Sequence, residues 1–243
     1  MLRANNNLIK NLKKQRRESD SLLFLDNFKI IKDALKGGLK AKYIFLANEE
    51  DNIFGEIDCP IYKVDKSIIG QLSDSKTPQG VVCIAEYTQH IEEKPKTNFL
   101  VLDRLQDPGN VGTLIRTACA CGFEYVYLLD SVKPTNSKLI RSTVGTIFQE
   151  KVISMTNQDF IEKAKEWNLS LLVADMDGEN IFKFETNQQI GLIIGNEGQG
   201  VSDELIKICS HKVRIPMKDG VESLNAGISG GIIMYQIAKN NLL

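Results

Sequence analysis

LDRLQDPGNVGTLIRTACACGF, residues 102 to 123, places a strand end, a turn and a helix in direct succession. Pro108 and Gly109 form a turn pair, and Asn110 is a residue type that caps helix N-termini. Gly122 is suited to ending the helix, because glycine readily adopts the left-handed backbone conformation found there. We therefore predict a strand, a polar turn and a helix of about three turns within this segment.

Short apolar strands alternate with helices from this segment to the C-terminus. Strands that are apolar on both faces and separated by helices are typical of a parallel sheet covered on both sides. The predicted strands lie at 99–103, 125–129, 152–155, 169–175, 191–195 and 213–217. The predicted helices lie at 110–121, 137–148, 158–167, 202–209 and 224–238.

The first 92 residues have a different organisation. A basic, helix-compatible start is followed by a helical pattern and strand-like runs, at 22–25, 27–35, 43–47, 61–64 and 81–87. The polar segment QHIEEKPKTN, residues 89–98, contains a proline and is typical of a linker. We predict a small α/β domain at residues 1–92 and a parallel-sheet α/β domain at 98–243.

Composition narrows the class of protein. The 243 residues are 42% hydrophobic with a formal charge of −1, so global charge gives no sign of a polyanionic partner. An odd set of five cysteines without a C-x-x-C pair, and no apparent leader peptide, favour a reducing cytoplasm. No apolar run reaches the ~18 residues that span a membrane. With two histidines, both far from any cysteine pair, we expect no metal site and no Ser-His-Asp hydrolase.

The first 20 residues hold six basic side chains against two acidic ones. Short basic runs are most often solvated helix faces, but phosphate contact is the alternative. The residues concerned are Lys10, Lys13, Lys14, Arg16 and Arg17. A second cation, Arg116, follows Asn110 by six residues among small side chains. It could pair with a surface carboxylate or hold a phosphate through two parallel hydrogen bonds.

GLIIGNEGQGVSDEL, residues 191 to 205, runs from an apolar strand through a glycine-rich loop into a helix. It lacks the glycine spacing of dinucleotide folds and the lysine of triphosphate loops. Glu197 would repel a bare phosphate, so a neutral or cationic ligand suits the loop better. The structural alternative is a tight turn that needs positive φ at Gly198 and Gly200, which leaves Asn196 and Glu197 unexplained.

VRIPMKDGVESLNAGISGGIIMYQI, residues 213 to 237, opens a helix whose first half contains Gly227, Gly230 and Gly231. Each interior glycine costs a helix roughly 1 kcal/mol relative to alanine. Several together indicate that something packs very close to this backbone. Another helix, a second subunit and a ligand all remain possible, with helix packing favoured.

Together these segments resemble the three signature motifs of the SpoU (TrmH-like) RNA 2′-O-ribose methyltransferases of the SPOUT superfamily. DPGNVGTLIRTA is similar to the first motif, LIIGNEGQGVS to the second and IPMKDGVESLNAGISGGI to the third, in the family's order. The TPQG segment at residues 77–80 resembles the end of the family's substrate-binding domain. The resemblance implies S-adenosylmethionine as methyl donor, a deep trefoil knot in the C-terminal domain, an rRNA or tRNA substrate and a homodimer.

The resemblance also implies roles for individual residues. It makes the catalytic set Asn110, Arg116, Glu197, Ser223 and Asn225. It gives cofactor binding to Gly195, Asn196, Gly200, Ile215, Met217 and Leu224. With an RNA substrate, phosphate contact becomes the preferred role of the N-terminal basic residues.

The chemistry of the motifs agrees with this assignment. A sulfonium methyl is already activated, so catalysis depends largely on positioning it against the ribose oxygen. No histidine lies in any motif, and a guanidinium with a pKa above ~12 rarely gives up its proton. We therefore hypothesise that Arg116 grips a phosphate and orients the hydroxyl, while the proton leaves to phosphate or solvent.

Two other classes stay open at this point. A non-catalytic RNA-binding protein could keep the fold, because AGISGG at 226–231 departs from the more Val/Ala-rich family version. A nicotinamide oxidoreductase on a doubly wound sheet is disfavoured by the missing glycine fingerprint.

Overall fold

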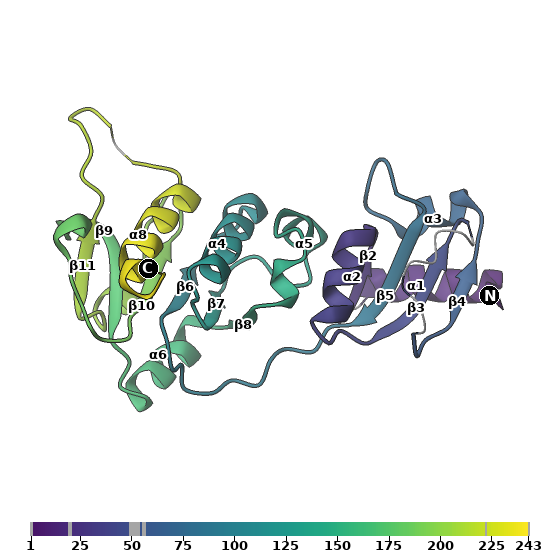
Figure 1. Cartoon of the computed structure of the whole chain (residues 1–243), viewed down its shortest axis with the longest axis horizontal. Helices are drawn as coiled ribbons and strands as arrows, with labels where there is room; N and C mark the ends of the chain where they lie inside the picture. The colour runs from purple at the N-terminus through teal and green to yellow at the C-terminus, as the bar shows by residue number, and fades with distance from the viewer. Residues whose placement is uncertain (1, 19–20, 49–53, 55–56, 222, 243) are drawn as a thin grey trace. The chain divides into compact units, whose positions relative to one another are not determined.

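The computed structural model describes residues 2–18, 21–48, 54, 57–221 and 223–242 of the chain. It divides into two compact units, Met1–Thr88 and Gln89–Leu243, each with its own sheet (Figure 1). They are called the N-terminal unit and the C-terminal unit below.

The N-terminal unit is a five-stranded mixed sheet in the order β1-β4-β3-β5-β2. β4 pairs in parallel with β1 and β3, whereas β5 is antiparallel to both β3 and β2. The elements are β1 (Leu2–Arg3), α1 (Asn6–Glu18), β2 (Leu22–Leu25), α2 (Phe28–Lys36), β3 (Ala41–Leu46), β4 (Ile61–Lys63), α3 (Lys66–Leu72) and β5 (Val81–Glu86). Sequence patterns did not predict β1 or α3, which are both short.

Apolar side chains of α1 and α3 share one core on the same face of this sheet. Ile9 and Leu12 of α1 and Ile69 of α3 are buried there against Phe45 of β3. Figure 1 shows α2 in front of the sheet and α1 behind it, so the two helices cover opposite faces. The sheet is therefore covered on both sides and exposes its edges and strand ends.

The C-terminal unit contains a six-stranded sheet in the order β11-β9-β10-β6-β7-β8, and each pair of neighbouring strands is parallel. Its strands are β6 (Phe99–Asp103), β7 (Tyr125–Leu129), β8 (Lys151–Met155), β9 (Leu171–Asn180), β10 (Gly191–Gly195) and β11 (His211–Arg214). Its helices are α4 (Pro108–Ala120), α5 (Ser137–Ser142), η2 (Thr146–Phe148), α6 (Asn157–Glu166), η3 (Ile181–Lys183), α7 (Asp203–Ile206) and α8 (Ala226–Leu242). The predicted parallel α/β sheet is confirmed.

The two faces of this sheet are covered by different helices. Phe160 of α6 and Leu205 of α7 join the core formed by Val101 and neighbouring strand residues. On the opposite face α8 packs against α4, where a Cβ added at Gly230 would lie 2.2 Å from Cδ2 of Leu114. Close helix packing thus accounts for this glycine. The trefoil knot stays a prediction.

Several predicted boundaries were wrong, for identifiable reasons. α4 begins at Pro108, and its cap is Asp107, whose Oδ1 accepts a hydrogen bond from the Gly109 N–H at 2.8 Å. Asn110 is therefore inside the helix and is not its cap. The helix predicted at 137–148 is split, because Val144 has a φ of 53° and ends α5 before η2. Among the described residues, no helix is both long and apolar enough to cross a membrane.

Candidate active site at the carboxyl edge of the C-terminal sheet

The ends of two neighbouring strands bring the first and second motifs together. β6 and β10 are paired in parallel, with Asp103 opposite Gly195 at their carboxyl ends. The turn before α4 and the loop after β10 therefore start side by side. Open parallel sheets bind ligands at this edge, where loops from adjacent strands converge.

Three of the predicted catalytic residues form one chain of hydrogen bonds. Asn110 Nδ2 donates to Glu197 Oε1 at 2.8 Å, and Asn225 Nδ2 donates to Asn110 Oδ1 at 2.8 Å. Asn225 Oδ1 also accepts from the N–H groups of Gly227 and Ile228, so it caps α8. Residues from all three motifs, up to 115 positions apart, thus meet at one point.

Arg116 does not join this chain of hydrogen bonds. It lies on the exposed surface of α4, and no hydrogen bond or ion pair is found for it among the described residues. Arg116 follows Asn110 by six residues, and each residue turns an α-helix by about 100°. The two side chains therefore point about a third of a turn apart around the helix axis. Its guanidinium is therefore available to a partner other than the described residues of its own chain.

The loop after β10 is held in shape by Asn196. Asn196 Oδ1 accepts from the N–H groups of Gly198 at 2.9 Å and Gln199 at 3.1 Å. Gly200 has a φ of 67°, whereas Gly198, for which we predicted the same, does not have positive φ. A Cβ at Gly195 would lie 2.3 Å from the Gly200 backbone carbon. Asn196, Gly195 and Gly200 therefore have a structural role in forming this loop.

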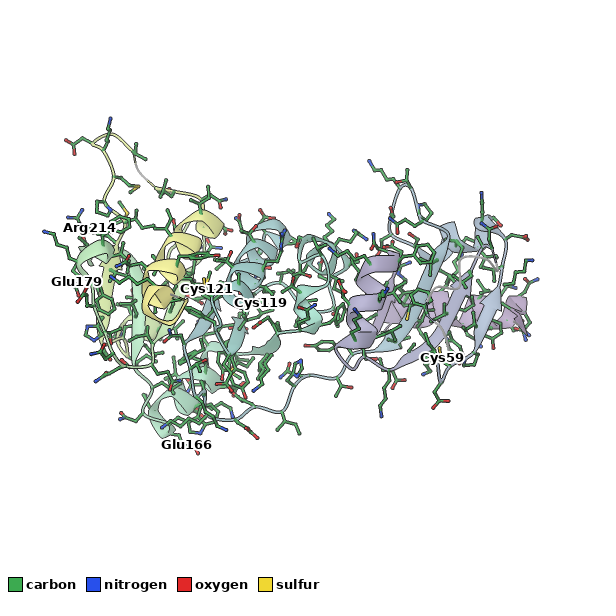
Figure 2. The ribbon with its side chains drawn as sticks, viewed as in Figure 1. Cys59, Cys119, Cys121, Glu166, Glu179 and Arg214 are labelled. Carbon is green, nitrogen blue, oxygen red and sulfur yellow. The ribbon has the colours of Figure 1, made fainter. Side chains whose placement is uncertain are left out.

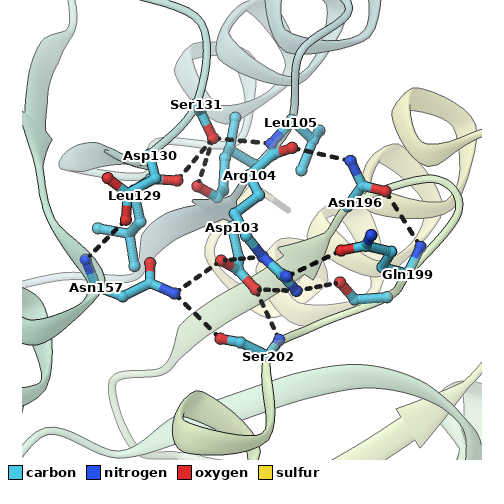
Figure 3. Close-up of polar contacts among 12 residues, drawn as sticks. Asp103, Arg104, Leu105, Leu129, Asp130, Ser131, Asn157, Asn196, Gln199 and Ser202 are labelled. Atoms are coloured by element: carbon cyan, nitrogen blue, oxygen red, sulfur yellow. Dashed lines mark hydrogen bonds and ion pairs between the residues drawn. The ribbon is translucent and has the colours of Figure 1, made fainter.

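A buried carboxylate beneath this loop was missed by the sequence analysis (Figure 3). Asp103 is fully buried and accepts from the Ser202 N–H at 2.7 Å and from Asn157 Nδ2 at 3.0 Å. It also accepts from Arg104 Nε at 3.2 Å and Nη2 at 3.3 Å. A buried charge is stable only when paired and hydrogen-bonded in this way.

Arg104 extends the network from Asp103 to the loop (Figure 3). Its Nη1 donates to Gln199 Oε1 at 3.1 Å and its Nη2 to the Gly200 carbonyl at 3.2 Å. Its own carbonyl accepts from Asn196 Nδ2 at 3.0 Å. Arg104 also has a φ of 57°, which is uncommon for a residue other than glycine. The loop that carries Glu197 is therefore anchored on both sides by Arg104.

A cavity of about 130 Å³ lies beside the third motif. Three predicted cofactor residues line it, Ile215, Met217 and Leu224, together with the predicted catalytic residue Ser223. Gly195, Asn196 and Gly200 are not among its lining residues. The lining also includes Asp175 and Met176 at the end of the buried part of β9, which the sequence analysis missed because they lie outside the three motifs.

Asp175 gives this largely apolar cavity a negative charge. Its Oδ1 accepts from the Asp177 N–H, and its Oδ2 pairs with Lys212 Nζ at 3.1 Å. The backbone hydrogen bond from Asp177, opposed by partial burial and reinforced by Lys212, holds the pKa of Asp175 below its ordinary value. A carboxylate at an apolar cavity suits a cationic ligand with apolar parts.

The cysteines offer neither a nucleophile nor a metal site. Cys119 lies in α4 and Cys121 directly follows it (Figure 2). All five cysteines are free thiols. Burial raises the pKa of both Cys119 and Cys121 to about 11, which keeps them protonated at neutral pH. Within the described ranges, no group of three or more His, Cys, Asp or Glu side chains could hold a metal ion.

Arg16, one of the predicted RNA-binding residues, is already engaged within its own unit. Its Nη1 donates to the Leu72 carbonyl at 2.9 Å, and its Nη2 pairs with the Asp74 carboxylate. Its guanidinium also lies 4.7 Å from the centre of the Phe24 ring. These contacts join α1 to the end of α3, so Arg16 has a clear structural role.

The other basic residues of α1 are placed differently. Lys10 and Lys14 are exposed, and Lys13 is half-buried with its Nζ 3.2 Å from Gln71 Oε1. The side chain of Arg17 lies outside the described residues. Lys10, Lys13 and Lys14 therefore stay predicted RNA contacts.

The chain is similar to proteins of a known family. Residues 97–235 match the model of the SpoU rRNA Methylase family. The chain belongs to the SpoU rRNA methylase family. Residues 28–90 match a second model, described as RNA 2′-O ribose methyltransferase substrate binding. The predicted family and enzyme class, an S-adenosylmethionine-dependent RNA 2′-O-ribose methyltransferase, are confirmed, and the nicotinamide oxidoreductase alternative is wrong.

Individual relatives support the same family. The 23S rRNA (guanosine(2553)-2′-O)-methyltransferase RlmP of Bacillus subtilis is 28% identical over 93% of this chain and 91% of its own length. A tRNA/rRNA methyltransferase of Synechocystis sp. is 32% identical over 73% of this chain and 67% of its own length.

Solved structures show the same fold over the whole chain. An AdoMet-bound rRNA methyltransferase from Sinorhizobium meliloti superposes with a TM-score of 0.83 at 25% identity, covering 100% of this chain and 98% of the other. A TrmH family RNA methyltransferase from Porphyromonas gingivalis gives 0.86 at 22% identity, with 98% and 99% covered. At 22% identity the second comparison bears on the fold alone.

Proposed function

We propose that this chain methylates a ribose 2′-hydroxyl of ribosomal RNA at the carboxyl edge of its C-terminal sheet. The observation that carries the proposal is the chain of hydrogen bonds Glu197–Asn110–Asn225, which adjoins the cavity through Ser223 and Leu224. The similarity to RlmP, a 23S rRNA 2′-O-methyltransferase, supports rRNA as the substrate.

The residues around the cavity fit S-adenosylmethionine. When bound, this cofactor supplies a methyl group that its sulfonium activates. Ile215, Met217 and Leu224 offer apolar contact, and Asp175 offers a charge opposite to that of a sulfonium. At about 130 Å³ the cavity is smaller than the ~300 Å³ of pockets that enclose a whole ligand, so part of the cofactor would extend beyond it.

The hydrogen-bonded series Glu197–Asn110–Asn225 positions the Glu197 carboxylate. Asn110 and Asn225 each donate one N–H and accept at their oxygens, so both amides have one orientation. They hold the Glu197 carboxylate at the strand ends, where Arg104 supports its loop. Such fixed groups can align a ribose hydroxyl against a methyl donor, and alignment is the main demand of this reaction.

We assign phosphate binding to Arg116, and the proton of the ribose hydroxyl to phosphate or solvent. His211 is the first residue of β11, so it lies at the amino edge of the parallel sheet, opposite the carboxyl edge that carries the candidate site. His211 is therefore not placed to act as a general base there. The exposed guanidinium of Arg116 can hold a phosphate through two parallel hydrogen bonds, which a lysine ammonium cannot copy.

Substitution of Arg116 tests this assignment. Arg116→Ala is expected to abolish methyl transfer while the dissociation constant for S-adenosylmethionine stays within about twofold, a change of ~0.4 kcal/mol. Arg116→Lys keeps the charge but loses the paired geometry, so turnover should also fall at least about tenfold. Radiolabelled methyl transfer and calorimetry measure the two quantities. Recovery of most of the turnover in Arg116→Lys would contradict the paired contact.

We also propose a homodimer. Ile228 and Tyr235 are seven positions apart on α8, are therefore nearly in line, and are 56% and 53% exposed. A second copy covering this face would remove large apolar side chains from water. Sedimentation of the full chain at micromolar concentration tests the dimer.

Contacts to RNA outside the active site are assigned to the N-terminal unit. Lys10, Lys13 and Lys14 lie on α1, and neutralising phosphates is their proposed role. An rRNA substrate would place the protein in the cytoplasm.

A further inference from the structure

A hollow of about 410 Å³ lies at one edge of the N-terminal sheet. It is formed by the end of β3, the first turn of α3 and the segment before β5, and its polar lining residues are Asn48, Lys66 and Gln79. β2 and β3 lie on either side of β5 and are antiparallel to it, so their carboxyl ends flank the amino end of β5 on this side of the sheet. The volume lies within the ~300–1,000 Å³ range of pockets that hold small ligands.

The walls of the hollow are held in place by hydrogen bonds. The Gly80 carbonyl accepts from the Ala47 N–H at 2.8 Å, which joins two walls, and Gly80 has a φ of 87°. The turn between α3 and this segment is ordered by Asp26, which is 6% exposed. Asp26 accepts from Ser73 Oγ at 2.6 Å and from the Ser75 N–H at 3.1 Å. The hollow is therefore largely preformed.

The polar lining offers hydrogen-bond donors and one positive charge. Gln79 Oε1 accepts from the Phe28 N–H at 3.2 Å, which orients the amide and leaves its two Nε2 hydrogens without a partner among the described residues. Lys66 is the charged residue of the lining, is exposed, and forms no ion pair within the described part of the chain. Such a lining matches a ligand that carries acceptor atoms and negative charge.

Aromatic rings lie next to these donors. Phe28, whose backbone contacts Gln79, stacks on Phe54 with ring centres 5.9 Å apart and an angle of 20°. Both rings are half-exposed. Proteins recognise unpaired RNA by combining aromatic stacking with hydrogen bonds to base edges and cations near the phosphates. All three components occur within this small region.

We propose that this hollow binds one unpaired nucleotide of the RNA substrate, with Lys66 contacting its phosphate and Gln79 donating to an acceptor atom on its base. The inference rests on the proposed RNA methyltransferase function and deepens it. The match of residues 28–90 to a substrate-binding model gives no position for the contact. The hollow would let the N-terminal unit select unpaired RNA by chemistry rather than by charge alone.

Two substitutions and one matched control test the proposal in the full-length protein. Gln79→Glu keeps an oxygen for the Phe28 N–H but removes the amide donors. Lys66→Gln removes the charge, and Lys36→Gln makes the same change at the far end of α2. The probe is a fluorescent single-stranded RNA of mixed sequence, compared with its duplex by anisotropy at fixed salt.

The expected result is specific to the single strand. Gln79→Glu should weaken its binding about tenfold or more, and Lys66→Gln severalfold, as expected for the loss of one charged or base contact. Lys36→Gln should bind as the unchanged protein does, and duplex binding should change less than single-strand binding. Thermal unfolding of each variant shows whether it is folded, and photocrosslinking of 4-thiouridine RNA should label the peptide around Gln79.

Single-strand affinities within twofold of the unchanged protein for both folded variants would overturn the proposal. Crosslinks confined to the C-terminal unit would also overturn it. Failure of the proposed function looks different, because the unchanged protein would then transfer no methyl group to rRNA in the presence of S-adenosylmethionine. The binding measurement does not depend on that transfer.

Discussion

At the scale of single residues, the Asp103 carboxylate joins the end of β6 to the loop that carries Glu197. It accepts from Arg104, Asn157 and Ser202, and Arg104 in turn contacts Gln199 and the Gly200 carbonyl. In the sequence, an aspartate followed by an arginine at the end of a strand is a common pattern that does not indicate a special role. Their importance comes from burial and from partners almost a hundred positions away, which sequence patterns do not show.

Asp103→Asn is expected to lower both stability and turnover. The amide would turn N–H groups toward donors that now face a carboxylate, at a cost of ~1–3 kcal/mol. Asp107→Asn is the matched control, because asparagine and aspartate cap helices about equally well. Urea unfolding and methyl-transfer rates measure the two effects. Equal behaviour of the two variants would show that the buried network does not support the loop.

Asp175 should make the folded protein sensitive to acid. Its pKa is lowered on folding by the hydrogen bond from Asp177 and by Lys212, so its stabilising contribution is present above the unfolded pKa of ~3.9. That contribution is lost as the pH falls through the lower folded pKa. Lys212→Met should therefore reduce the free energy of unfolding at pH 6, and the difference should shrink below pH ~4. A difference that grew on acidification would contradict this assignment.

At the scale of elements, α8 and α4 approach closely because of one glycine in particular. A Cβ at Gly230 would lie 2.2 Å from Cδ2 of the fully buried Leu114, whereas at Gly231 the nearest atom is 3.9 Å away on Thr117. The glycine-rich start of this helix therefore contains one position that packing requires and one that it tolerates. The pattern in the sequence could not distinguish them.

Alanine substitutions at these two positions should have different effects. Both gain up to ~1 kcal/mol of helix propensity, which cancels in the comparison. Gly230→Ala also meets a packed core, where overpacking costs ~1–3 kcal/mol. We expect Gly231→Ala to be the more stable of the two by at least ~1 kcal/mol in chemical unfolding. Equal stabilities would mean that α8 and α4 can separate without cost.

The elements themselves show what sequence patterns can predict. β6, β7 and β10 lie where short, mostly apolar runs predict them, because strands buried on both faces are rich in apolar residues. The predicted start of α4 was wrong because Asp107 and Asn110 are both residue types that cap helices. Only Asp107 accepts a hydrogen bond from the first turn. α3 was not predicted because its seven residues are too few to show a clear helical period in the sequence.

At the scale of the whole molecule, the candidate site is assembled only by folding. Asn110, Glu197 and Asn225 are recognisable by their motifs, but their mutual hydrogen bonds depend on the register of β6 with β10 and on the cap of α8. Motif similarity therefore proposed which residues form the site, and the structure added which of them hydrogen-bond to one another. Asp175, outside every motif, lines the cavity beside the third motif, on the strand β9 that pairs with β11.

Mass-spectrometric mapping of ribose methylation on rRNA is the most direct test of the central claim. RNA from cells lacking the protein would be incubated with S-adenosylmethionine and either the unchanged protein or Asn110→Ala. We predict a new 2′-O-methyl group with the unchanged protein and none with Asn110→Ala. Absence of any new ribose methylation with a folded, cofactor-binding protein would contradict the claim and favour a non-catalytic RNA-binding role.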